Sequence, residues 1–173
     1  MIVALNFYEI NKAAGTLIRT GEITNLESST VPYLEADLIN LFTLEYPISL
    51  LHKYLRETFV HQALNNLAEW DSYFFNSCFA IASDVDYLYL MGNGGTITKV
   101  GGVSNWPSMV MKINKSDLNI SVFINGLITS YGGSGGQFGS VTSNYFIVLS
   151  PWENRILYKY NKSDLSYVGT YGF

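Results

Sequence analysis

The stretch Lys159-Tyr160-Asn161-Lys162-Ser163-Asp164-Leu165 decides the fold of this 173-residue chain, because the chain contains it more than once. An earlier copy reads Lys112-Ile113-Asn114-Lys115-Ser116-Asp117-Leu118, and a degraded third copy reads Glu9-Ile10-Asn11-Lys12-Ala13-Ala14-Gly15. Each copy has an apolar or aromatic residue before Asn-Lys, then a polar turn, then a β-rich run. Internal repeats indicate one supersecondary unit used several times. The repeated unit here is a β-hairpin.

Residues 73–173 read as two units of four short strands. Clusters of Gly, Asn, Asp and Pro separate the strands, as turn residues do. Four short antiparallel strands per repeat are typical of a β-propeller blade. The predicted strands are 79–82, 87–90, 109–113 and 120–124 in the first unit, and 139–142, 145–149, 155–160 and 166–171 in the second.

The N-terminal half divides into a hairpin and a segment of helical period. Residues 1–24 predict a β-hairpin equivalent to half a blade, with its turn at 11–15. In 25–72, Thr30-Val31-Pro32 resembles a helix start, and apolar residues then recur three and four positions apart. We therefore expect a helical insertion that covers a sheet edge or barrel end, or alternatively a partner-binding helix pair. The apolar residues are Leu34, Leu38, Leu41, Phe42, Ile48, Leu51, Leu55 and Phe59.

The second unit carries a family resemblance. The Gly-rich run 132–139 with Gln137-Phe138, then Asn154-Arg155-Ile156, an Asn-Lys turn and a closing Gly169-Thr170-Tyr171-Gly172, resembles one repeat of an NHL-type β-propeller. Residues 79–124 share only the strand pattern. Propellers of this family close a ring of about six blades, within the usual range for propellers. Two blades and a half blade imply an incomplete ring, and an uncapped end sheet implies self-association.

Composition limits the partner classes. The chain has 10 Lys+Arg against 14 Asp+Glu, with no cluster of cations, which argues against a nucleic-acid partner. No apolar run approaches the roughly 20 residues of a spanning helix. Charged residues make up 14% and aromatic residues 15% of the chain. This balance suits an extracellular or virion surface, or a surface buried against copies of itself, and an ordinary soluble domain is the alternative.

Residues with catalytic or metal-binding chemistry form no recognisable pattern. His52 and His61 would lie on opposite faces of one helix, since each residue rotates the helix by about 100°. We therefore predict no metal site, no cofactor and no catalytic residues. The Gly-rich run has no Lys and no following helix, so it is not a phosphate-binding loop. Asp84 and Asp86 could pair around a cation, but capping of a turn is the simpler interpretation.

Three aromatic residues in loops are the predicted contact residues: Trp106, Tyr131 and Trp152. A large ring in a polar loop offers rigid contact area, although packing within the loop is the alternative. The sequence thus predicts a mainly β chain of propeller-like, four-stranded antiparallel blades in an incomplete ring. Its expected function is that of a non-enzymatic binding or assembly module that engages protein or glycan within a multi-subunit surface structure such as a virion. The alternative is a subunit of an NHL-like propeller lyase or hydrolase, completed by oligomerisation.

Overall fold

The computed structural model describes residues 3–11, 13–26, 30–46, 50–67, 69–70, 73–96, 108–125, 138–150 and 156–172. Their secondary structure consists of β-strands joined by turns, so the mainly β prediction is confirmed. The strands are β1 Val3–Ile10, β2 Leu17–Leu26, β3 Thr30–Ala36, β4 Asn40–Tyr46, β5 Leu50–Leu55, β6 His61–Asn66, β7 Glu69–Trp70, β8 Tyr73–Ser83, β9 Tyr87–Thr96, β10 Ser108–Asn114, β11 Ile120–Asn125, β12 Phe138–Val141, β13 Tyr145–Ser150, β14 Ile156–Asn161 and β15 Tyr167–Gly172.

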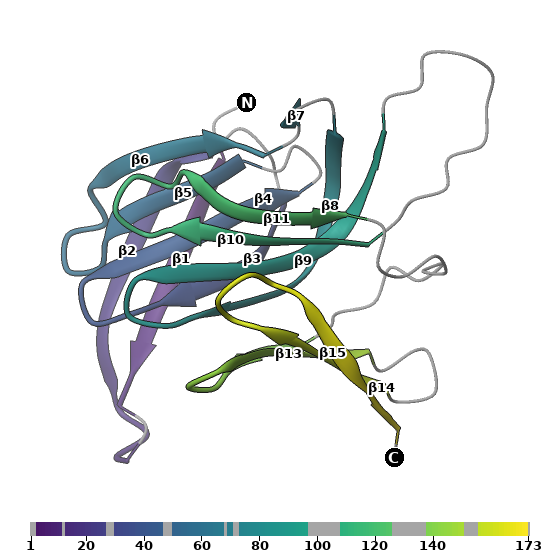
Figure 1. The fold of residues 1–173 in the computed structure, drawn as a ribbon. Helices are drawn as coiled ribbons and strands as arrows, with labels where there is room; N and C mark the ends of the chain where they lie inside the picture. The colour runs from purple at the N-terminus through teal and green to yellow at the C-terminus, as the bar shows by residue number, and fades with distance from the viewer. Residues whose placement is uncertain are drawn as a thin grey trace.

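The strands form four antiparallel sheets that follow one another in chain order (Figure 1). Sheet 1 is the hairpin β1-β2, and sheet 2 is β3-β4-β5-β6. Sheet 3 is β11-β10-β9-β8 with the two-residue β7 at its edge, and sheet 4 is β12-β13-β14-β15. The first long strands of successive sheets lie against one another, β3 against β8 and β8 against β12. The sheets are therefore arranged like propeller blades, and as predicted they do not close a ring.

The helical insertion predicted for 25–72 is wrong, because the described part of that segment is sheet 2. Leu38, one of the residues in the helical pattern, lies in the turn between β3 and β4. Sheet 2 packs between sheets 1 and 3, so consecutive residues of β4, from Leu41 to Glu45, are all buried. A strand that is buried on both faces loses the alternation of apolar and polar residues. The resulting apolar spacing mimicked an amphipathic helix.

Each sheet contains the same wide turn between its last two strands. In each turn the first N–H donates to the sixth carbonyl, and the fifth N–H donates to the first carbonyl, at 2.8–2.9 Å. The fifth residue has positive φ in every case. The turns are 11–16, 55–60, 114–119 and 161–166. The repeated Asn-Lys hairpin is thus confirmed, and a fourth copy at 55–60 lacks the Asn-Lys pair.

The left-handed position of the wide turn is occupied by Gly15, but also by Phe59, Leu118 and Leu165, with φ of 56–61°. A non-glycine residue in this conformation costs about 1–2 kcal/mol. Leu118 and Leu165 are fully buried between sheets, and burying a leucine contributes about 1.5–3 kcal/mol. Packing between sheets therefore offsets the local strain of the turn.

Phe59 makes a close contact with sheet 1. A Cβ added at Gly21 in β2 would lie 1.8 Å from the Phe59 ring, so the ring occupies the space that any side chain would need. Phe59 also packs against the small buried cluster of Ile23, Leu26, Leu41 and Tyr54. Gly21 is therefore required for the contact between sheets 1 and 2.

We predict that Gly21→Ala destabilises the chain by about 1–3 kcal/mol, the usual cost of overpacking. The measurement is thermal unfolding followed by circular dichroism at a fixed protein concentration. Gly172→Ala is the matched control, because a Cβ there meets no atom within 4 Å. Equal melting temperatures for the two variants would contradict the proposed contact.

Candidate functional site

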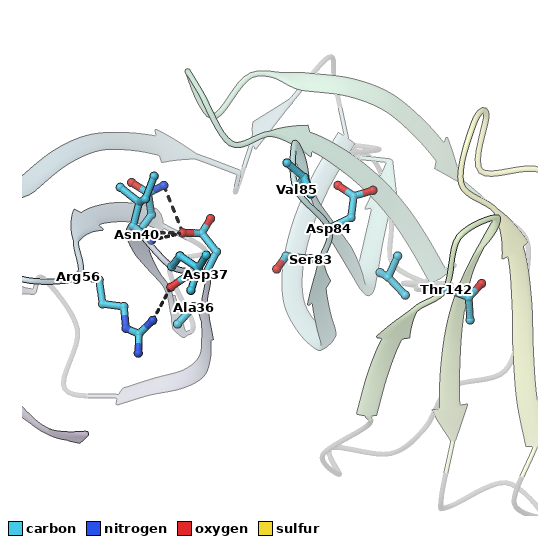
Figure 2. A pocket seen from close by; sticks show the side chains of 11 residues that line it. Ala36, Asp37, Asn40, Arg56, Ser83, Asp84, Val85 and Thr142 are labelled. Atoms are coloured by element: carbon cyan, nitrogen blue, oxygen red, sulfur yellow. Dashed lines mark hydrogen bonds between the residues drawn. The ribbon is translucent and has the colours of Figure 1, made fainter. Parts of the chain in front are cut away.

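Short turns from three sheets surround a depression of about 740 Å³ (Figure 2). The turns join the first two strands of sheets 2, 3 and 4. Arg56 from the wide turn of sheet 2 also lines the depression. The other lining residues are Ala36, Asp37, Leu38, Ile39, Asn40, Ser83, Asp84, Val85, Val141 and Thr142.

Each tight turn is closed by the side chain of its first residue. Asp37 Oδ1 accepts the N–H groups of Ile39 and Asn40 at 2.8 and 2.6 Å. Asp84 Oδ1 accepts those of Asp86 and Tyr87 at 3.0 and 2.8 Å. In sheet 4, Thr142 Oγ1 accepts the Tyr145 N–H at 3.0 Å. Side chains that cap their own turn in this way are a common use of Asp and Thr. Asp84 is therefore a turn cap, as the simpler interpretation of the sequence expected.

In sheets 3 and 4 the repeated lysine of the wide turn ties the sheet to the one before it. Lys115 Nζ in sheet 3 lies 2.7 Å from Asp37 Oδ2 in sheet 2. Lys162 Nζ in sheet 4 lies 2.7 Å from Asp84 Oδ2 in sheet 3. Lys115, only 4% exposed, also donates to the carbonyl of Asp84 at 2.7 Å. In both of these copies the lysine of the Asn-Lys motif therefore binds the tight turn of the preceding sheet.

These contacts keep both carboxylates ionised. Burial alone would raise the pKa of Asp37, but hydrogen bonds from Lys115, Asn40 and Ile39 outweigh it and lower the pKa to about 2. The pKa of Asp84 is likewise lowered, because Lys162 and the Tyr87 N–H outweigh the effect of burial. An acid of low pKa is poorly matched to proton transfer near neutral pH. These two carboxylates are therefore poorly suited to act as general acids at neutral pH.

Apolar side chains stand at the tips of two of these turns. Leu38 is 89% and Val85 88% exposed, and Ile39 is also exposed. Turn tips usually carry Gly, Asn, Asp or Ser, so exposed aliphatic residues at two of these turns are unusual. We name Leu38, Ile39 and Val85 the apolar rim. Sequence reasoning missed the rim, although an aliphatic residue directly after each capping aspartate was a visible signal.

A buried polar cluster lies in sheet 2, on β4, β5 and β6. Glu45 is fully buried, and its Oε1 lies 2.5 Å from His52 Nε2. His52 Nδ1 lies 3.2 Å from Nε2 of the exposed His61. Because the segment is a sheet, the prediction that the two histidines lie on opposite faces is wrong. Burial, together with the charge of Glu45, raises the pKa of the adjacent Tyr54 to about 12.

The cluster forms a hydrogen-bonded chain from solvent at His61 to the interior at Glu45. The corresponding positions of β10 and β14 hold Met111 and Tyr158, so the polar chain is particular to sheet 2. Within the described ranges, no group of three or more His, Cys, Asp or Glu side chains could hold a metal ion. We assign the cluster a structural role at the contact between sheets 1 and 2.

The predicted contact residues Trp106, Tyr131 and Trp152 lie outside the described residues, as do most of the Gly-rich run and Asn154-Arg155. No helix in the described part of the chain is long and apolar enough to cross a membrane. No protein-family model matches the chain, and no curated protein matches it. The blade-like arrangement of the described residues therefore rests on their four-stranded antiparallel sheets.

We predict that Asp37→Asn lowers the free energy of unfolding at neutral pH. The variant's free energy of unfolding should also change less between neutral and acidic pH. The pKa of Asp37 is about 2 in the folded chain and about 3.9 in an unfolded one, so its contribution is complete above about pH 4 and lost as the pH falls toward 2. Denaturant unfolding across this range measures the effect. Asp86→Asn, which removes the same charge from an exposed side chain, is the control, and identical acid profiles for the two variants would contradict the role of Asp37.

Proposed function

We propose that the chain is a non-enzymatic, propeller-like assembly module that engages protein through apolar sheet faces at the two ends of its series of sheets. The observation that carries the proposal is that both ends present the kind of residue that the chain buries at its internal contacts. The cross-strand pairs define which positions of the four sheets are equivalent.

Sheets 2 and 3 each turn one face toward the following sheet. On that face two apolar residues of the second strand pair with an apolar residue and a lysine of the third strand. The apolar residues are at most 2% exposed. We call this set the forward face; it consists of Phe42, Leu44, Leu51 and Lys53 in sheet 2, and of Tyr89, Met91, Val110 and Lys112 in sheet 3.

Sheet 4 has a forward face of the same composition. Ile147 pairs with Lys159, and Leu149 pairs with Leu157, as in the preceding sheets. These residues are only partly buried, and the neighbouring Tyr171 is exposed. The described chain places no further sheet on this face.

At the opposite end of the series, sheet 1 also has apolar residues that no neighbouring sheet in the described chain covers. The residues one and three positions before each wide turn lie on the face that is turned toward the preceding sheet. We call this the backward face. In sheets 2, 3 and 4 they are buried. In sheet 1 they are Tyr8 and Ile10, which are 68% and 57% exposed. The buried equivalents are His52 and Tyr54, Met111 and Ile113, and Tyr158 and Tyr160.

Uncovered apolar faces favour association, because burying apolar surface contributes about 25 cal/mol per Å². Contiguous exposed apolar patches on soluble proteins usually mark sites of interaction. The apolar rim offers a further surface for a protein or glycan partner.

The low charge and high aromatic content support a place within a multi-subunit surface structure such as a virion. The carboxylates of Asp37 and Asp84 are engaged in turns and ion pairs, so these residues do not favour the alternative of a propeller enzyme.

We predict that the mass in solution rises above the 19.4 kDa of one chain as the concentration increases. Sedimentation velocity over a wide concentration range measures this mass. Ser143→Glu, at the exposed tip of the tight turn of sheet 4, is a control that should leave association unchanged. A chain that remains a monomer at every concentration would overturn the proposed assembly function.

A further inference from the structure

We infer that the forward face of sheet 4 binds the backward face of sheet 1 of a second copy of this chain, head to tail. This inference rests on the proposed assembly function and specifies its contact. The internal contacts of the chain provide the template, since in each of them a forward face receives the backward face of the next sheet.

The contact between sheets 3 and 4 shows how the apolar parts fit. The forward face of sheet 3, with Tyr89, Met91 and Val110, packs against Tyr158 and Tyr160 of sheet 4 in one buried cluster. Tyr8 and Ile10 occupy the positions of Tyr158 and Tyr160 in sheet 1. The forward face of sheet 4 offers Ile147, Leu149 and Leu157 in return. Both halves of an apolar contact are therefore present on one chain, at opposite ends.

A polar contact fixes the register at each internal boundary. Lys53 Nζ on the forward face of sheet 2 donates to the Lys115 carbonyl at 2.7 Å and lies 3.3 Å from the Ser116 carbonyl, both in the wide turn of sheet 3. Lys112 Nζ on sheet 3 lies 3.5 Å from the Ser163 carbonyl in the wide turn of sheet 4. At the boundary of sheets 1 and 2 the same place holds the Glu9–Arg56 ion pair. A forward-face residue therefore reaches the wide turn of the next sheet at every boundary.

Lys159 is the forward-face lysine of sheet 4, and it is already positioned for this contact. Its Nζ lies 3.7 Å from the ring centre of Tyr145, as Lys112 Nζ lies 4.1 Å from that of Tyr87. The wide turn 11–16 has the same backbone hydrogen bonds as the turns that accept Lys53 and Lys112. By equivalence with Ser116 and Ser163, the Ala13 carbonyl of the second copy is the acceptor for Lys159.

The contact is heterologous, because it joins two different faces. Repeated head-to-tail contacts generate a closed ring if the rotation permits and an open filament if it does not. A contact between two forward faces would instead bring two Lys159 side chains together, which like-charge repulsion disfavours. The internal boundaries contain no contact of that kind among the described residues.

The test uses one variant for each face of the full chain. Tyr8→Glu blocks the backward face and Leu157→Glu blocks the forward face. Each variant alone is expected to weaken association by more than about tenfold, because an unpaired carboxylate is costly to bury in an apolar contact. A mixture of the two retains one intact contact and should form a one-to-one pair by sedimentation velocity. The Tyr8→Glu/Leu157→Glu double variant should remain a monomer.

The outcomes separate the two proposals. A monomeric unmodified chain overturns the assembly function. Association of the unmodified chain without recovery in the mixture overturns the head-to-tail contact and leaves the assembly function standing. Association that neither single variant weakens places the contact elsewhere and also overturns this inference. Ile10→Glu and Lys159→Glu serve as second variants of each face if circular dichroism shows that the first pair does not fold.

Discussion

Sheets 2 and 3 bury apolar residues on both faces and therefore depend on a neighbour on either side. Sheet 3 shows the requirement most fully, with Leu88, Leu90 and Met111 packed toward sheet 2 and Tyr89, Met91 and Val110 packed toward sheet 4. Short antiparallel strands alone contribute little stability, since an isolated hairpin is marginal in water. The fold is consequently stabilised between sheets. The left-handed Leu118 and Leu165 illustrate this balance, because only burial between sheets makes their backbone conformation favourable.

The polar contacts define how neighbouring sheets align. Lys115 loses most of its hydration, and burying a lysine is costly unless it is paired and hydrogen-bonded. The Asp37 carboxylate and the Asp84 carbonyl supply those partners. A buried ion pair is weak evidence for stability, but its geometry admits one alignment and excludes others. We therefore regard the lysine contacts as the feature that gives successive sheets the same relative position, and the apolar contacts as the source of the stability.

The sequence predicted what is encoded locally. The Asn-Lys turns were recognised because turn chemistry resides in consecutive residues, and the wide turns at 114–119 and 161–166 share theirs. Sheet 2 was mistaken for helices because its wide turn at 55–60 lacks that pair and because its central strands are buried on both faces. The lysine contacts with Asp37 and Asp84 could not be predicted, since each joins different sheets. The pairing of His52 with His61 was missed for the same reason as sheet 2 itself.

The proposed contact between copies differs from the internal contacts at one position. In sheets 2 and 3 the tight turn begins with an aspartate, which binds the lysine of the following wide turn. In sheet 4 that position is Thr142, whose hydroxyl already accepts the Tyr145 N–H. The wide turn of a second copy would therefore meet a neutral oxygen instead of a carboxylate, and charge-assisted hydrogen bonds are roughly twice as strong as neutral ones. The contact between copies would thus lack the charged pair found at the boundaries of sheets 2 and 3 and of sheets 3 and 4. Copies would associate reversibly, while the sheets within each chain stay together.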